Sequence, residues 1–316
     1  MLDLRFPRPK RSPWELLRSA LFSCALVLIS QFALASVPWL FPSISLLAML
    51  PIAALVMAVT IFLGRFWRRL FDVSASAPAL VLFNLLFMWG VYITVIRKAV
   101  PSLLDAVLNA ECALLLYGLY RIFSSDPGAV SFSSSTVESG QNEFDTLNVQ
   151  FEQNSPTLSR VRYCKNCKTG IKGFDHHCPA FGNCIGHKNH RLFIILLAGF
   201  LIAESSYTMS STKFLTKSAD AQRMENILAS SLVISTMLFC ILQVLWQVVF
   251  LIWHIYCICF NIKTEEWINW KRYPEFQLMI EPQPGSPFGE TRFTNPYNKG
   301  LLDSWRGRKF IMLRWS

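Results

Sequence analysis

The residues best suited to chemistry crowd into one short stretch of this 316-residue chain. Cys164 and Cys167 form a Cys-x2-Cys pair, residues 174–179 read Phe-Asp-His-His-Cys-Pro, and Cys184 follows shortly after. A tetrahedral zinc site takes four Cys or His ligands, and one tight turn between paired Cys residues directs both thiolates to the ion. The stretch therefore predicts a metal site to which Cys164 and Cys167 contribute.

The same stretch holds more candidate ligands than one zinc ion needs. The remaining candidates are His176, His177, Cys178, Cys184, His187 and His190. Spacing alone does not sort them, and a purely structural zinc knuckle would explain the whole cluster. The competing interpretation is catalytic, because an Asp and a His beside a Cys offer an orienting carboxylate, a general base and a nucleophile on one loop.

Cysteine usage favours metal binding or catalysis over a disulfide scaffold. The chain has nine Cys residues, and the Cys-rich stretch also contains His residues, a pattern typical of reduced thiols in the cytosol. The other Cys residues lie in or beside apolar segments, where a free Cys usually serves as a packing residue. These are Cys24, Cys112, Cys240, Cys257 and Cys259.

The segments that must position this stretch have the composition of a membrane protein. Apolar residues make up 53% of the chain and charged residues 16%, and the mean hydropathy is +0.36. Spanning a bilayer takes about 20 apolar residues, and six segments qualify: 16–37, 44–63, 78–96, 103–123, 192–212 and 227–259. We expect an all-α polytopic membrane protein with about six transmembrane helices and a small zinc-bound cysteine-rich domain between spans four and five.

Lys and Arg residues indicate which ends of the spans face the cytosol, because cytosolic loops hold an excess of them. With a cytosolic N-terminus, most Lys and Arg residues fall on the cytosolic side. The opposite loops then hold Arg97, Lys98, Lys213, Lys217 and Arg223. We therefore expect both termini and the cysteine-rich domain in the cytosol, on an endomembrane (Golgi, ER or vacuole) or the plasma membrane.

Composition and motifs predict six parts along the chain. They are a basic N-terminal segment with two extra spans (1–77), spans three and four (78–123), a Ser-rich cytosolic linker (124–160), the cysteine-rich domain (161–191), spans five and six (192–260) and a cytosolic C-terminal segment (261–316). No internal repeat indicates an inverted-repeat transporter. Asp105, Glu111 and Glu204 lie in spans, where we expect interhelical hydrogen bonds rather than a transport path.

Several further motifs surround the Asp-His-His-Cys run at residues 175–178. They are Asp-Pro-Gly at 126–128, Gly186 with Asn189 and Phe193, Lys-Thr-Glu-Glu at 263–266, and Asn-Pro-Tyr-Asn-Lys-Gly at 295–300 with Trp305 beyond. In these motifs and their order, the region from Pro78 to Trp305 resembles the DHHC protein S-acyltransferases, or palmitoyltransferases. Lys263 stands where that family usually has the first Thr of a Thr-Thr-x-Glu motif.

The resemblance implies a role for each member of the cluster. Cys178 would be the acylated nucleophile, His176 its general base and Asp175 the residue that orients His176. One structural zinc ion would be held by Cys164, Cys167, His177 and Cys184. His187 and His190 would then be ordinary polar residues.

The chain also departs from the family pattern in two ways. A second zinc site would need an upstream Cys-x2-Cys, a His before Cys164 and a Cys at position 170, but Tyr163 and Gly170 occupy the last two positions. All ligands of this second site are missing together, which indicates that the second zinc site was lost as a whole. Ala180 replaces a usual Trp near the nucleophile, so acyl-chain or substrate preference is expected to differ.

As implied by the resemblance, the expected activity is transfer of a long-chain fatty acyl group, such as palmitoyl, from acyl-CoA to protein cysteine thiols through a Cys178 acyl-enzyme. The expected partners are acyl-CoA, membrane-associated proteins with cytosolic cysteines, and the lipid bilayer. Nucleic acid is not expected, because the net charge of +10 suits basic loops near anionic lipid. The alternatives are a catalytically inactive DHHC-like membrane scaffold and a transporter with an unrelated zinc knuckle.

Overall fold

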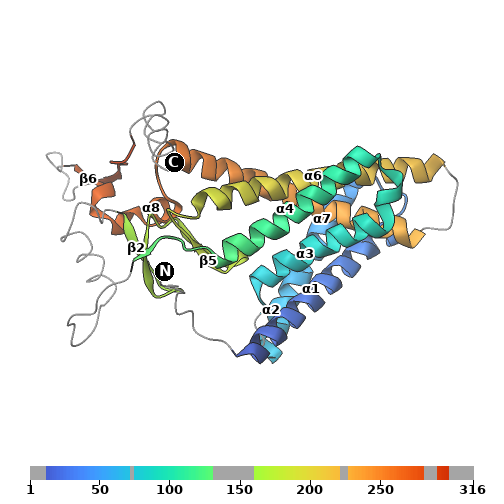
Figure 1. Cartoon of the computed structure of the whole chain (residues 1–316), viewed down its shortest axis with the longest axis horizontal. Helices are drawn as coiled ribbons and strands as arrows, with labels where there is room; N and C mark the ends of the chain where they lie inside the picture. The colour runs from blue at the N-terminus through green and yellow to red at the C-terminus, as the bar shows by residue number, and fades with distance from the viewer. Residues whose placement is uncertain (1–11, 72–74, 131–159, 221–226, 281–289, 299–316) are drawn as a thin grey trace. The chain divides into compact units, whose positions relative to one another are not determined.

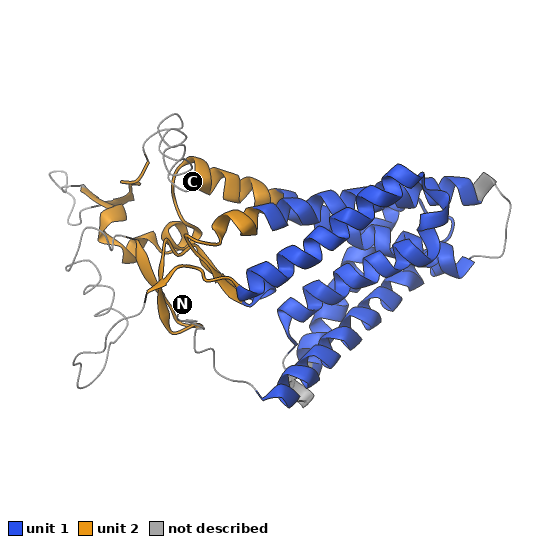
Figure 2. Ribbon diagram, viewed as in Figure 1, with its two compact units in different colours: residues 1–124, 179–182, 195–248 blue, residues 125–178, 183–194, 249–316 orange. Residues whose placement is uncertain are grey.

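The computed structural model describes residues 12–71, 75–130, 160–220, 227–280 and 290–298 (Figure 1). Most of the expected Ser-rich linker, the last two residues of the Asn-Pro-Tyr-Asn-Lys-Gly motif (299–300) and Trp305 lie outside the described residues. The chain separates into two compact units (Figure 2). Unit 1 comprises residues 1–124, 179–182 and 195–248, and unit 2 comprises residues 125–178, 183–194 and 249–316. Each unit is described by itself.

Unit 1 is built from helices. They are α1 (Pro13–Leu40), α2 (Leu46–Phe71), α3 (Ala77–Val91) and α4 (Ser102–Ser124), with most of α6 (His190–Asp220) and α7 (Ile227–Cys259). A π-helical turn (Tyr92–Ile96) and a 3-10 turn (Arg97–Ala99) extend α3. Six helices in the described part of the chain are long and apolar enough to cross a membrane, which confirms the expected polytopic helical fold.

Local sequence explains where these helices begin. The Ser12 side chain caps α1 by accepting the Glu15 backbone N–H at 3.2 Å, and the Glu15 carboxylate accepts the Ser12 backbone N–H in return. Pro13 follows at the first helical position, where its missing N–H costs no hydrogen bond. The Ser76 side chain caps α3 by accepting the Ala79 backbone N–H. Helices α2 and α3 both pack against α1.

The acidic residues inside unit 1 make hydrogen bonds between helices. Ser206 of α6 donates to Glu111 of α4 at 3.1 Å, and Gln247 of α7 donates to Glu204 of α6 at 3.1 Å. Asp105 accepts a hydrogen bond from the Tyr92 hydroxyl at 3.0 Å. Because a carboxyl group among apolar helices needs a partner, these contacts confirm the expected interhelical role.

Unit 2 contains short antiparallel strands and the one-turn helix α8 (Thr264–Ile268). The first sheet has the order β1-β3-β2, the second pairs β4 with β5, and the third pairs β6 with β7. The strands are β1 (Ala129–Val130), β2 (Val161–Cys164), β3 (Thr169–Lys172), β4 (His176–Cys178), β5 (Asn183–Ile185), β6 (Gln277–Ile280) and β7 (Glu290–Phe293). Strands this short rely on what packs between them, and here Cys164, Ile171, Phe174 and Cys184 form a common core.

Arg160 connects the start of β2 to the C-terminal part of unit 2. Its guanidinium donates to Glu266 at 2.7 and 2.5 Å and to the Asn261 side chain at 3.0 Å. The same group lies over the Tyr297 ring, 4.1 Å from its centroid. Two residues further on, Arg162 pairs with Glu275 and lies 4.1 Å from the ring centroid of Tyr273. These contacts tie β2, and the sheet to which it belongs, to the residues after α7.

Candidate metal centre and the adjoining Asp-His-Cys site

Strand β4 separates two sets of side chains by its geometry. Successive side chains of a strand point to opposite faces, so His176 and Cys178 share one face and His177 points to the other. In the antiparallel pair β4–β5, His177 lies directly opposite Cys184. Three consecutive residues therefore serve two different sites.

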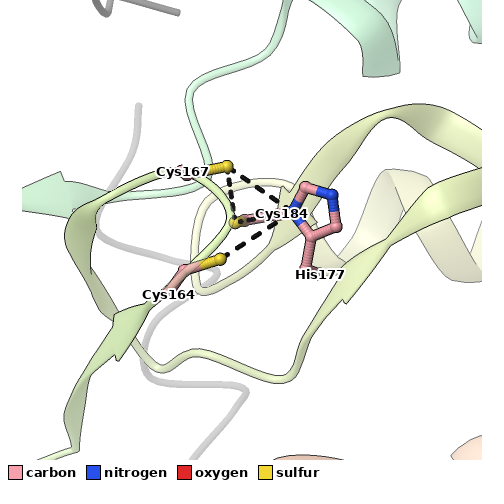
Figure 3. A group of neighbouring side chains, drawn as sticks. All are labelled: Cys164, Cys167, His177 and Cys184. Atoms are coloured by element: carbon pink, nitrogen blue, oxygen red, sulfur yellow. Dashed lines mark hydrogen bonds between the residues drawn. The ribbon is translucent and has the colours of Figure 1, made fainter.

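On the His177 side, three sulfur atoms gather around one ring nitrogen (Figure 3). His177 Nδ1 lies 3.8 Å from Cys164 Sγ, 3.5 Å from Cys167 Sγ and 3.5 Å from Cys184 Sγ. The Cys167 and Cys184 sulfur atoms are 3.3 Å apart. Tetrahedral zinc with ordinary bond lengths would place such ligand atoms about 3.5 to 3.8 Å apart. These four side chains could hold a metal ion.

The electrostatics of the four side chains suit a metal ion. Hydrogen bonds with Cys167 and Cys184 hold the pKa of the Cys164 thiol far below its usual value. Hydrogen bonds with Cys164 and Cys167 raise the pKa of His177 to about 10. Cys164 thus favours thiolate, the form of Cys that binds metal, whereas hydrogen bonds with Cys164 and Cys167 raise the pKa of the Cys184 thiol, which must lose its proton when an ion binds.

The Asp-Pro-Gly motif packs against the loop that follows β5. The Asp126 carboxylate accepts the backbone N–H groups of Gly128 and Ala129 at 2.8 and 3.0 Å, which shapes the turn. The turn comes so close to Gly186 that a Cβ atom there would lie 2.3 Å from the Pro127 carbonyl oxygen and 2.6 Å from an Ile171 methyl carbon. Only glycine fits at position 186 without a local shift.

On the other side of β4, Asp175 is fully buried and hydrogen-bonded at each polar group. Its carboxylate lies 2.9 Å from His176 Nδ1 and accepts the Thr264 backbone N–H at 3.1 Å. Its backbone N–H donates to the Ile185 carbonyl at 2.8 Å, and its carbonyl accepts the Glu265 N–H at 2.9 Å. Burial opposes ionisation, but the His176 hydrogen bond and the Lys263 charge hold the pKa of Asp175 well below its usual range.

His176 interacts with both Asp175 and Cys178. Burial opposes the charged imidazolium, yet hydrogen bonds with Asp175 and Cys178 raise the pKa of His176 to about 9. Its ring also meets Phe193 edge-on, at 5.3 Å between centroids. Cys178 is 7% exposed. The arrangement can hold an imidazole in one orientation, move a proton from a thiol to it, and stabilise the resulting charge.

Two further histidines, which the sequence analysis did not place in this site, lie around Asp175. His190 Nε2 and His254 Nδ1 are each 3.9 Å from a carboxylate oxygen of Asp175. His190 is therefore not an ordinary polar residue as expected, because folding brings the first turn of α6 to the carboxylate. His254 could have been recognised from the sequence in one way: it is an ionisable residue inside an apolar span, and such residues usually have a functional role.

Comparison with known proteins places this site in a family. Residues 143–271 match the family model described as DHHC palmitoyltransferase. The chain is 48% identical to palmitoyltransferase AKR1 of Mortierella alpina over 56 residues, which cover 18% of this chain and 10% of the relative. It is 29% identical to human palmitoyltransferase ZDHHC9 over 145 residues, 45% of this chain and 35% of the relative.

A longer match covers more of the chain. The chain is 27% identical to mouse palmitoyltransferase ZDHHC17 over 223 residues, which cover 61% of this chain and 32% of the relative. The chain thus spans about a third or less of the length of these relatives, between 10% and 35%. The matched residues 143–271 contain both the Cys3His cluster and the Asp175, His176 and Cys178 group, so the part of the chain that carries this site matches the DHHC palmitoyltransferase family.

Proposed function

We propose that this protein is a protein S-acyltransferase that moves a long-chain fatty acyl group from acyl-CoA to cysteine thiols of membrane-associated proteins. The observation that carries the proposal is the position of His176, which bonds the buried Asp175 carboxylate at 2.9 Å and also interacts with the Cys178 thiol. A carboxylate, an imidazole and a thiol in this order are the parts of a nucleophilic triad.

The first step acylates the enzyme. His176 takes the Cys178 proton, and the thiolate attacks the thioester carbonyl of acyl-CoA. The C–S bond to CoA breaks as the new C–S bond to Cys178 forms, and the CoA sulfur leaves as a thiolate that takes up a proton. Asp175 holds the imidazole orientation and stabilises the imidazolium.

The second step transfers the acyl group to a protein. A substrate cysteine thiolate attacks the Cys178 thioester, and Cys178 leaves and regains a proton through His176. The two half-reactions share one covalent intermediate, so the expected kinetics are ping-pong. Palmitoyl is the acyl group proposed.

The proposed metal is one structural zinc ion held by Cys164, Cys167, His177 and Cys184. The donor set Cys3His is typical of structural zinc, and the sulfur and nitrogen atoms lie at distances that suit it. When bound, the ion supplies folding energy to strands too short to be stable alone. It takes no part in the acyl transfer.

Basic residues of unit 2 are proposed contacts for the phosphate groups of CoA. Burial and the charges of Lys172, Lys263 and Arg191 lower the pKa of His187, which indicates a concentration of positive charge around this residue. The protein is proposed to have both termini and residues 161–191 in the cytosol, on an endomembrane or the plasma membrane, because Lys and Arg residues are concentrated on that side.

The test is labelling of the full-length protein in membranes with an alkyne analogue of palmitate. Wild type is compared with Cys178→Ser, and with Cys257→Ser as a matched control because Cys257 is a buried thiol of the same unit. The proposal expects a hydroxylamine-sensitive label in wild type and Cys257→Ser that is absent from Cys178→Ser. Absence of the label from all three, with zinc bound and the protein folded, would indicate the inactive scaffold instead.

A further inference from the structure

His254 is a buried imidazole without a hydrogen-bond partner among the described residues. Its exposed fraction is 0%, and neither ring nitrogen is hydrogen-bonded to any residue that the structure describes. The ring packs against Phe193 and Phe250, with centroids at 4.9 and 4.5 Å. A buried polar group without a partner costs free energy, so this imidazole indicates a ligand that supplies one.

Two possible metal ligands, Asp175 and His176, lie close to His254. The three residues offer ligand atoms that all lie within 4.8 Å of one another. The relevant distances are 3.9 Å from His254 Nδ1 to Asp175 Oδ2 and 2.9 Å from His176 Nδ1 to the same oxygen. Zinc bonds of about 2.0 to 2.2 Å would place tetrahedral N and O ligands about 3.3 to 3.6 Å apart, between these two values.

We propose that Asp175, His176 and His254 form a second binding site for a divalent transition metal ion of the zinc class, and that the metal inhibits acyl transfer when it occupies this site. Two imidazoles and one carboxylate are an established ligand set for zinc, with one coordination position left open. This site is separate from the Cys3His cluster and shares no ligand with it.

The inhibitory effect follows from which atoms the metal needs. Coordination by His176 Nδ1 displaces the proton between Nδ1 and Asp175, and the neutral imidazole then carries its one remaining proton on Nε2, so neither ring nitrogen has a free lone pair. His176 then no longer serves as the base for Cys178. The positive charge of Lys263, which acts on Asp175, opposes a second cation, so this site is weaker than the Cys3His cluster.

The first experiment measures zinc per chain in the purified full-length protein at buffered free zinc concentrations. Wild type is expected to rise from one to two zinc ions per chain, and His254→Gln to remain at one. His254→Cys keeps a zinc ligand and is expected to reach two. His190→Asn is the matched control, because His190 also lies 3.9 Å from Asp175 but is outside the ligand set.

The second experiment measures inhibition of Cys178 acylation by added zinc, each variant being compared with its own rate in zinc-buffered medium. The inhibition constant is expected to rise at least about tenfold in His254→Gln and to stay within about twofold of wild type in His190→Asn. This readout rests on the proposed acyltransferase function, whereas zinc stoichiometry does not. A protein that binds two zinc ions but is never acylated at Cys178 would support the metal site and overturn the proposed acyltransferase function.

Two results would overturn the metal site. One is a wild-type protein that stays at one zinc ion per chain at saturating free zinc. The other is a second zinc ion that binds His254→Gln as tightly as wild type. If His254→Gln does not fold, Co²⁺ added to zinc-loaded wild type decides the matter, since visible d–d absorption supports the site and its absence overturns it.

Discussion

His177 lies opposite Cys184 in the β4–β5 pair, with its Nδ1 3.5 Å from the Cys184 sulfur. The residues on either side of His177 are His176 and Cys178, whose side chains point away from that cluster. A metal ion bound on one face of β4 would therefore fix the position of the imidazole and thiol on the other face. A change to either face is expected to affect both, and the two effects can be separated by measuring zinc content together with acylation.

Replacing His177 with Asn is expected to release zinc. The substitution removes one of four ligands, and loss of a structural metal is among the largest single-residue effects, about 4 kcal/mol or more. Zinc per chain should fall from one to near zero, and the thermal unfolding temperature in detergent should fall with it. His187→Asn is the matched control because His187 is exposed. Retention of zinc by His177→Asn would show that His177 is not a ligand.

Replacing Asp175 with Asn is expected to slow acylation of Cys178 while zinc stays bound. Asn keeps the size of Asp but not the charge that stabilises the imidazolium, and it permits the wrong imidazole tautomer. In a related triad this change lowers the rate by roughly 10⁴, so a loss of about 10²-fold to 10⁴-fold is expected. Asp126→Asn, at an aspartate outside the triad, serves as the control. An unchanged acylation rate in Asp175→Asn would exclude the orienting role.

Replacing Arg160 with Lys is expected to destabilise unit 2 although the charge is kept. The Arg fork binds Glu266 through two nitrogens and also lies over the Tyr297 ring, and an ammonium group cannot reproduce either geometry. Because the Glu266 side chain is only 1% exposed, a cost of about 2 to 4 kcal/mol is expected. Thermal unfolding measures it, with the exposed Arg272→Lys as control. Equal unfolding temperatures for both variants would contradict the contact.

Replacing Gly186 with Ala is expected to disturb the turn beside β5. The added Cβ would meet the Pro127 carbonyl oxygen at 2.3 Å, and backbone shifts of this kind cost about 1 to 3 kcal/mol. Gly90→Ala is the matched control, because a Cβ atom at position 90, in α3, would have no neighbour within 4 Å. There the higher helix propensity of Ala should leave stability unchanged or slightly raised. Equal responses of the two variants in thermal unfolding would be evidence against the close approach.

The sequence by itself determined the membrane fold and the family motifs. Apolar length is a local property of each segment, and six segments long enough to span a bilayer could be read directly from hydropathy. For the last of them, residues 227–259, the expected range coincides with α7. The short strands that carry the Cys and His residues were not assigned, because segments of three or four residues have too little periodicity to recognise.

Only the tertiary structure decided which groups meet. Spacing left His176, His177 and Cys178 unsorted, and it was the pairing of β4 with β5 that placed His177 beside Cys184 and the other two on the opposite face. Contacts across long sequence distances are not encoded in local spacing, so His254 next to Asp175 and Arg160 next to Glu266 were not predictable. Folding alone brings α6, α7 and α8 to the carboxylate of Asp175, where their backbone and imidazole groups surround one buried charge.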